Sequence, residues 1–196
     1  RSPEDIFTEI DNSGLGFPVI IRIAGSHGGE TSRLITGMDD LVKLHVYPFD
    51  GSAFDLTEFV DYKSVDGNYR KHRIAIVDGV PILRHTLIDT NWMIHGASRY
   101  FMKRTQSLMD EAETQRHEFD GKTLPLIKPV IDEITKRLNL DYFGIDCNID
   151  EQGNLLIFEA NANMAMLYYD HPSQEKAVQE IQQHILKLIE KKQKLN

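Results

Sequence analysis

The chain of 196 residues has little cysteine, no long hydrophobic run and no block of basic residues before its C-terminal segment. A single cysteine, Cys147, excludes an intramolecular disulfide, and we expect a reducing, cytoplasmic location. No stretch approaches the roughly 18 consecutive apolar residues that cross a bilayer, so we expect no membrane partner. The net charge of −8 disfavours a nucleic-acid partner, because neutralising phosphates requires a basic surface.

The sequence does contain alternating signals for strands and helices. Apolar and β-branched runs predict strands at 17–24, 54–60, 69–77, 80–87, 142–149 and 154–160. Helical spacing of apolar residues predicts helices at 38–44 and 126–138, and a last helix that begins near Ser173. A polar helix is predicted at 106–118. Because hairpins and helices occur without strict strand–helix alternation, the pattern predicts an α+β fold with antiparallel sheets.

The dipeptide Asp78-Gly79 between two strand signals predicts a two-residue type I′ hairpin. In such a hairpin Arg73 lies opposite Arg84. Two facing arginines repel each other unless an anion lies between them. A phosphate or substrate role for Arg84 is therefore one interpretation, and two side chains that turn away into water are the other.

A second hairpin is predicted around Gln152-Gly153, again as a two-residue turn. That turn pairs Asp146 with Glu159 and Asn148 with Ile157, and it brings Asn161 to the face of the two carboxylates. Facing carboxylates repel each other unless a cation lies between them, and oxygen ligands of this kind suit magnesium. The spacing alone leaves open whether this is a metal site or a polar edge hairpin.

The segments Phe143-Gly144-Ile145-Asp146 and Leu156-Ile157-Phe158-Glu159-Ala160-Asn161-Ala162-Asn163 closely resemble the metal hairpin of the ATP-grasp superfamily. The resemblance extends from Gly14 to Asn163 and is strongest to the branch with glutathione synthetases and the ligase that adds glutamate to a ribosomal protein. It implies two lobes with antiparallel sheets and packed helices that grip a nucleotide, over residues 1–57 and 58–196. It also implies magnesium, or manganese as an alternative, at Asp146, Glu159 and Asn161.

The same resemblance assigns residues to ATP. A cation on the first strand and the Gly-rich loop after it would contact the phosphates, and backbone groups of a hinge would contact adenine. One of two aspartates would accept hydrogen bonds from the ribose, a choice that the sequence leaves open. These residues are Arg22, which stands where the family usually has lysine, then Gly25, Ser26, His27, Gly28, Gly29, Glu58, Phe59, Val60, and Asp61 or Asp66. On the substrate side, the resemblance points to Arg70, Arg84 and Asn91.

In the resembling family, ATP phosphorylates a substrate carboxylate and an amine then attacks the acylphosphate. We therefore expect an ATP- and magnesium-dependent carboxylate–amine ligase that acts on small molecules or peptides. A small-molecule kinase on the same scaffold and a non-catalytic nucleotide-binding module are the alternatives. The family normally has a further N-terminal lobe, whereas the first predicted strand here begins within 20 residues of the start. We therefore expect a fragment of a longer chain, or a site completed by another subunit.

Overall fold

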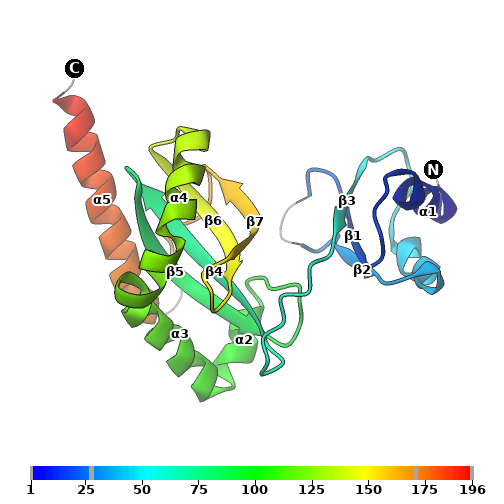
Figure 1. Ribbon diagram of the computed structural model, residues 1–196, viewed down its shortest axis with the longest axis horizontal. Coiled ribbons are helices and arrows are strands. Elements are labelled where there is room, and N and C mark those ends of the chain that lie inside the picture. Colours follow the sequence, from blue (N-terminus) through cyan, green and yellow to red (C-terminus); the bar gives the residue numbers. More distant parts are fainter. Residues whose placement is uncertain (1, 27–28, 170–171, 195–196) are drawn as a thin grey trace. The chain divides into compact units, whose positions relative to one another are not determined.

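The computed structural model describes residues 2–26, 29–169 and 172–194, and it divides into two compact units, Arg1–Asp61 and Tyr62–Asn196 (Figure 1). The sequence placed the boundary between its two lobes after residue 57. Each unit contains its own antiparallel sheet, which confirms the predicted α+β class. Among the described residues, no helix is both long and apolar enough to cross a membrane.

The first unit is built on a three-stranded antiparallel sheet. Its central strand β1 (Val19–Ile23) lies between β2 (Arg33–Ile35) and β3 (Phe54–Glu58). The sequence predicted β1 and β3 with longer bounds. It did not predict β2, whose three residues are too few for a recognisable alternation of apolar and polar side chains.

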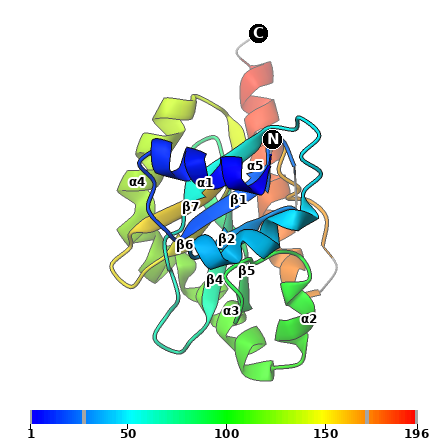
Figure 2. The ribbon, with the colours of Figure 1, turned by 90° about the vertical axis from the view of Figure 1, so that its right-hand side faces the viewer.

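Helix α1 (Pro3–Asn12) completes the core of the first unit and was not predicted. Ser2 caps it, because its hydroxyl accepts a hydrogen bond from the Asp5 N–H while the Asp5 carboxylate accepts one from the Ser2 N–H. The helix lies across the sheet (Figure 2) and buries apolar residues against it, as does Leu44 of the 3-10 helix η1 (Met38–Val46). The α1 residues buried there are Ile6, Phe7 and Ile10.

The second unit is built on a four-stranded antiparallel sheet in the order β5-β4-β6-β7. Its strands are β4 (Tyr69–Val77), β5 (Val80–Asp89), β6 (Tyr142–Ile149) and β7 (Leu155–Asn161). The β4–β5 turn is the predicted one: Asp78 and Gly79 both have positive φ, at 49° and 77°, as a type I′ turn requires. Strands β5 and β7 are the two edge strands of this sheet.

Helical segments pack around this sheet. They are α2 (Ser98–Lys103), α3 (Gln106–Glu118), the π-helical segment η2 (Phe119–Thr123), α4 (Leu124–Leu138) and, after the 3-10 turn η3 (Pro172–Gln174), α5 (Glu175–Gln193). The bounds of α3 are those that the sequence predicted. Helix α5 begins two residues after Ser173, with Gln174 at its N-cap, so the predicted cap is wrong.

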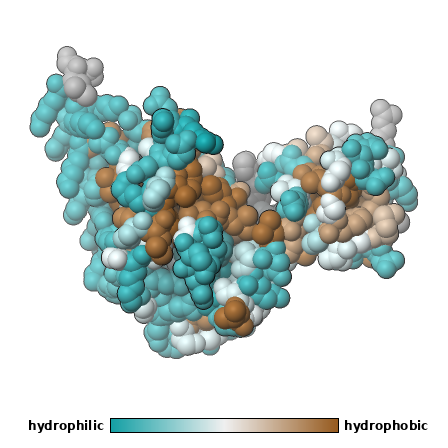
Figure 3. All heavy atoms as spheres, viewed as in Figure 1, coloured by the Kyte–Doolittle hydropathy of each residue, from teal (hydrophilic) through white to brown (hydrophobic). Residues whose placement is uncertain are grey.

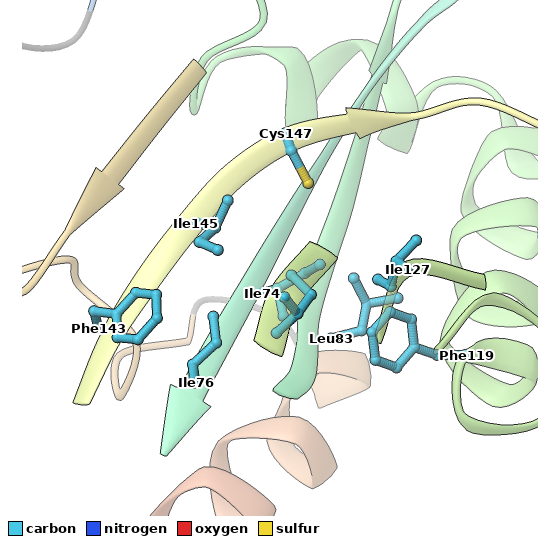
Figure 4. Packing of buried hydrophobic residues seen from close by; sticks show 9 residues of the cluster. Ile74, Ile76, Leu83, Phe119, Ile127, Phe143, Ile145 and Cys147 are labelled. Carbon is cyan, nitrogen blue, oxygen red and sulfur yellow. The ribbon is translucent and has the colours of Figure 1, made fainter. Parts of the chain in front are cut away.

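Alternation along the strands divides the second unit into two layers of core. Ile74 and Ile76 of β4 point to one face, where Figure 4 shows them packed with Ile127 of α4 and with Cys147 of β6, which is buried as predicted. Ala75 and Val77 point to the opposite face and pack with α5 through Ile181. The sheet therefore lies between α4 and α5.

Apolar side chains also reach the surface of the second unit. Figure 3 shows apolar atoms over the region of α4 and β7. Exposed residues of these elements include Leu126 and Val130 of α4, and Ile157 and Phe158 of β7.

Gly153 is required for two reasons, its positive φ and the lack of space for a side chain next to Leu126. Substitutions can separate the two. The φ of 84° at Gly153 disfavours any side chain, and an added Cβ would lie 2.7 Å from the Leu126 Cβ. Gly67 has the same strain, with φ at 83°, but has open space around it. We expect Gly67→Ala to lower the free energy of unfolding by about 1 kcal/mol, and Gly153→Ala by about 3 kcal/mol because overpacking adds to the strain.

Urea denaturation followed through the fluorescence of Trp92, the only tryptophan, measures both losses in the second unit. Equal losses for the two variants would contradict the predicted contact with α4.

Candidate functional site

A row of four polar residues crosses the sheet of the second unit from edge to edge. Glu159 of β7 is paired with Asp146 of β6, Asp146 with Arg73 of β4, and Arg73 with His85 of β5. Directly paired residues in a sheet point to the same face. The row therefore lies on one face, beside the row that contains Ala75 and hence on the side opposite α4.

Asp146 is the buried centre of this row, with only 3% of its surface exposed. Arg73 holds it with two hydrogen bonds, Nε to Oδ1 at 2.7 Å and Nη2 to Oδ2 at 2.8 Å, and the Lys71 Nζ lies 3.2 Å from Oδ2. Burial alone would raise the pKa of this carboxyl, but the ion pairs with Arg73 and Lys71 outweigh burial and hold the pKa below its ordinary value of 3.8.

The position of the row depends on two β-bulges. Arg84 is an extra residue in β5, because Arg73 pairs with His85 while Ile74 pairs with Leu83. The prediction that Arg73 faces Arg84 is therefore wrong. Bulges are frequent beside functional sites, where they redirect a side chain.

In the second hairpin, the predicted two-residue turn is wrong. The Gly153 N–H donates to the Asp150 carbonyl, and Gly153 has φ of 84°, which makes a three-residue loop followed by the pairing of Ile149 with Leu155. Asn148 consequently pairs with Leu156 and not with Ile157.

The predicted pairing of Asp146 with Glu159 is nevertheless confirmed. Phe158 is an extra residue in β7, since Cys147 pairs with Ile157. The longer turn moves the register by one residue, and this bulge moves it back before Asp146.

Glu159 and Asn161 provide further oxygen atoms near the end of β7. Glu159 is exposed and accepts a hydrogen bond from the Asn161 Nδ2 at 2.9 Å, while the Asn161 Oδ1 accepts one from the Asn163 N–H. Each carboxylate oxygen has two lone pairs. The two hydrogen bonds from Arg73 and the ion pair with Lys71 occupy three of the four lone pairs of the Asp146 carboxylate. One lone pair of Oδ1 remains for a cation.

This donor set fits magnesium chemically, because magnesium usually takes one or two carboxylates together with water and phosphate oxygens. The described residues contain no group of three or more His, Cys, Asp or Glu side chains that could hold a metal by themselves. A cation at this row would complete its ligands with water or with oxygen atoms of a bound molecule.

The arginines that the sequence predicted on the substrate side bind protein groups instead of facing open space. Arg84 is buried and donates to the carbonyls of Met166 and Tyr168, at 2.8 and 2.5 Å, which fixes the segment after β7 to the sheet. Arg70 donates to Asp66 and to Glu111 of α3. The Arg70 guanidinium lowers the pKa of Asp66 far below 3.8, so Asp66 is an ion-pair partner here. Their predicted substrate and ribose roles stay predictions.

Asn91 lies in the exposed segment after β5. Its N–H donates to the Asp89 carboxylate and its own Oδ1 accepts a hydrogen bond from the Met93 N–H, so the side chain shapes a turn. Its predicted place near a reacting carbonyl also stays a prediction.

The predicted phosphate contacts belong to the first unit. Arg22 on β1 is half-exposed and its Nε donates to Asp55 at 3.0 Å. The loop after β1 uses the left-handed conformation at Gly25 and Gly29, with φ of 75° and 77°, and the Ser26 hydroxyl donates to the Ile23 carbonyl. The loop residues His27 and Gly28 lie outside the described residues.

The predicted hinge begins at the last residue of β3. Glu58 is the last residue of β3 and pairs with Val19, the Phe59 N–H donates to the Pro18 carbonyl, and Val60 is exposed. Asp61 is the last residue of the first unit. The adenine contacts of Glu58, Phe59 and Val60, and the ribose contact of Asp61, stay predictions.

Sequence reasoning did not select Arg73 and His85 of the row, or Lys71 beside it, as site residues. The two hairpins could be paired from their turns, but the β4–β6 pairing joins residues 73 positions apart. Its local signal is that β4 carries Lys71 and Arg73 at alternating positions in its first half, within the polar run 70–73. Cations at that spacing share one face and suit a buried acid on a neighbouring strand.

Breaking the central ion pair on one side has an expected cost. Arg73→Gln leaves the Asp146 charge buried with Lys71 alone, and we expect the free energy of unfolding to fall by about 3 kcal/mol. The control is Arg137→Gln, which removes the exposed pair with Glu133 and should cost less than about 1 kcal/mol. Urea denaturation with Trp92 fluorescence compares them, and a similar small loss in both would show that Asp146 does not need Arg73.

The lowered pKa of Asp146 also predicts a pH dependence. Its ion pairs contribute fully to stability above its ordinary pKa of 3.8 and are lost as the pH falls through the lowered pKa. Asp146→Asn should therefore lose less stability than the wild type between about pH 5 and pH 2. Asp132 is exposed, so Asp132→Asn serves as control and should follow the wild type. If Asp146→Asn and the wild type lose the same stability at low pH, the ion pairs of Asp146 do not cause the pH dependence.

No protein-family model matches the chain, and no curated protein matches it. Among solved structures, a RimK domain ATP-grasp protein from Sphaerobacter thermophilus DSM 20745 is similar over 95% of this chain, with 12% identity and a TM-score of 0.50. D-alanine–D-alanine ligase from Bacillus anthracis is similar over 94%, with 14% identity and a TM-score of 0.49. The ATP-grasp ligase PsnB, in complex with a precursor peptide and AMPPNP, is similar over 93%, with 14% identity and a TM-score of 0.44.

The chain spans 57%, 55% and 50% of the lengths of these three proteins. At these identities the likeness concerns the fold alone. The RimK domain protein shares this fold over 95% of the chain. The chain has the ATP-grasp fold.

Proposed function

We propose that the protein is an ATP- and magnesium-dependent ligase that joins a carboxylate to an amine. The observation that carries this proposal is the pairing of Asp146 with Glu159 in a row that also contains Arg73. Two facing carboxylates are unfavourable in a sheet unless positive charge compensates both of them, and the ion pairs of Arg73 and Lys71 are with Asp146. The ATP-grasp fold supports a nucleotide as the molecule that brings this charge with its metal ion.

Asp146, Glu159 and Asn161 would hold the magnesium ion through oxygen atoms, and nucleotide phosphates would complete its ligands. When bound, the ion neutralises phosphate charge. Arg73 and Lys71 would place two further cations beside the phosphates, and they already balance the charge of Asp146. Catalysis of phosphoryl transfer consists mainly of positioning and electrostatic stabilisation, which such groups supply.

In the proposed reaction, a substrate carboxylate oxygen attacks the γ-phosphorus of ATP, and ADP leaves. The amine nitrogen then attacks the acylphosphate carbon, the C–O bond to phosphate breaks, and the amine gives up a proton. The products are an amide, ADP, inorganic phosphate and that proton. Arg22, the loop at 25–29 and the hinge at 58–61 are proposed to bind the nucleotide. The Arg22–Asp55 pair is exposed, so exchanging Asp55 for a phosphate costs little.

The metal assignment is tested by Glu159→Gln, which removes one charge and keeps the shape of the side chain. Isothermal titration with ATP should give a dissociation constant at least about tenfold higher for the variant in the presence of magnesium, a loss of about 1.4 kcal/mol. With ATP alone the two proteins should be alike. Glu133→Gln on the exposed face of α4 is the matched control. An unchanged magnesium dependence in Glu159→Gln would remove the metal site from the proposal.

The reaction class is tested by products. The full-length protein is incubated with ATP, magnesium and a panel of carboxylates and amino acids, with hydroxylamine added to trap an acylphosphate as a hydroxamate. ATP-dependent phosphate release with hydroxamate or amide supports the ligase. A stable phosphomonoester would identify a kinase instead, and tight binding of magnesium-ATP without any product would identify a nucleotide-binding module.

A further inference from the structure

A cavity of about 230 Å³ lies along the edge strand of the second unit. It is lined by residues of β5, α2 and α3 and reaches Gln174 at the end of η3. His85, the β5 member of the polar row, is one of its walls. The volume is below the range of roughly 300–1,000 Å³ typical of drug-sized ligands, so the cavity suits a smaller molecule.

The charges in this cavity favour an anion. Its walls contain four cationic and two acidic side chains, an excess of two positive charges in a chain whose net charge is −8. The cations are Arg84, Arg99, Lys103 and Arg116, and the acids are Asp110 and Glu113.

Both acids already have partners from α3. Asp110 accepts a hydrogen bond from the Gln106 Nε2 at 2.8 Å, and Glu113 is paired with Arg116 and with His117. Burial, and then the nearby cations with Arg84 first, hold the pKa of His85 well below 6.5, so its ring is neutral at pH 7 and adds no charge.

Two buried nitrogen atoms of the cavity walls have no hydrogen-bond partner among the described residues. They are the Arg116 Nε and the His85 Nδ1, from α3 and β5 respectively. Buried polar groups in folded proteins are nearly always paired, and an exception calls for an explanation. A polar ligand in the cavity supplies one.

The remaining wall is apolar. Leu87 of β5, Met102 of α2, and Met109 and Ala112 of α3 line it. A free inorganic anion would leave this surface without a contact, whereas an acid with a hydrocarbon part would cover it. Methionine side chains adapt readily to ligands of irregular shape.

We propose that this cavity binds a small organic acid. Its carboxylate would lie among Arg99, Lys103 and Arg116, and its apolar stem against Met102 and Met109. The binding does not depend on the proposed ligase function. If that function holds, the acid is one of its substrates, because the cavity shares His85 with the row that contains Asp146.

The test uses the six methionines of the chain, labelled with ¹³C in their methyl groups. The protein is titrated, without ATP or metal, with 4-methylpentanoate, with the uncharged 4-methylpentan-1-ol and with inorganic phosphate. We expect the signals of Met102 and Met109 to shift with 4-methylpentanoate and to saturate. The dissociation constant should be at least fivefold lower for this acid than for the alcohol or for phosphate, since only the acid has both groups.

Substitutions assign the binding to the cationic wall. Arg116→Gln and, independently, Lys103→Gln should each raise the dissociation constant of 4-methylpentanoate at least fivefold. Lys103 is exposed on a short helix, so its loss does not endanger the fold. Arg137→Gln removes an exposed arginine that also pairs with a glutamate on its own helix, and it should leave binding unchanged.

Three results would overturn the proposal: no shift of Met102 and Met109, equal binding of the alcohol or of phosphate, or unchanged binding in both cavity variants. Because nucleotide and metal are absent, a failed ligase assay does not affect this result. Conversely, a failed titration leaves the magnesium test of Glu159 intact.

Discussion

The structure of the second unit depends on one buried ion pair, between Arg73 of β4 and Asp146 of β6. A carboxylate that is 3% exposed is stable only with compensating charge and hydrogen bonds, and Arg73 supplies two bonds in a bidentate geometry. The pair joins two central strands that are far apart in the sequence. It also determines which face of the sheet is polar, because Ile74 and Ile145, the next pair along, are buried on the side of α4.

The two bulges align residues of the edge strands β5 and β7 with this ion pair. The bulge at Phe158 brings Glu159 opposite Asp146, and the bulge at Arg84 brings His85 opposite Arg73. Arg84 itself then holds the segment that follows β7 through the carbonyls of Met166 and Tyr168. One row of the sheet thus connects the proposed metal-binding carboxylates with the cavity on β5, because His85 belongs to both.

Local patterns were sufficient to predict most elements of the fold. The bounds of β4 and β6 follow from their apolar and β-rich runs, and α3 was predicted with its observed bounds as a polar helix. The Asp78-Gly79 turn follows from residues that tolerate positive φ. The Asp146–Glu159 pairing was predicted correctly although its turn was not, because the longer loop and the bulge shift the register in opposite directions.

Other features could not be predicted, because they arise from contacts between distant segments. The β4–β6 pairing has no connecting turn that would fix its register, so the contact of Arg73 with Asp146 was not predicted. Arg73 was placed against Arg84 instead of His85, because no local pattern marks the bulge in β5. The contact of Arg70 with Glu111 joins residues 41 positions apart, and no local pattern marks it. Helix α1 is a different case: it was missed although its start carries local signals, the cap formed by Ser2 and Asp5 and the proline Pro3 at its first position.

The central claim is that the polar row binds the metal ion of a nucleotide. Its most direct test is the anomalous diffraction of crystals grown with manganese and a non-hydrolysable ATP analogue, since manganese replaces magnesium at oxygen ligands. The account predicts one anomalous peak within about 2.2 Å of carboxylate oxygens from both Asp146 and Glu159. A nucleotide-bound manganese ion away from both carboxylates, with the Arg73–Asp146 pair intact, would contradict it.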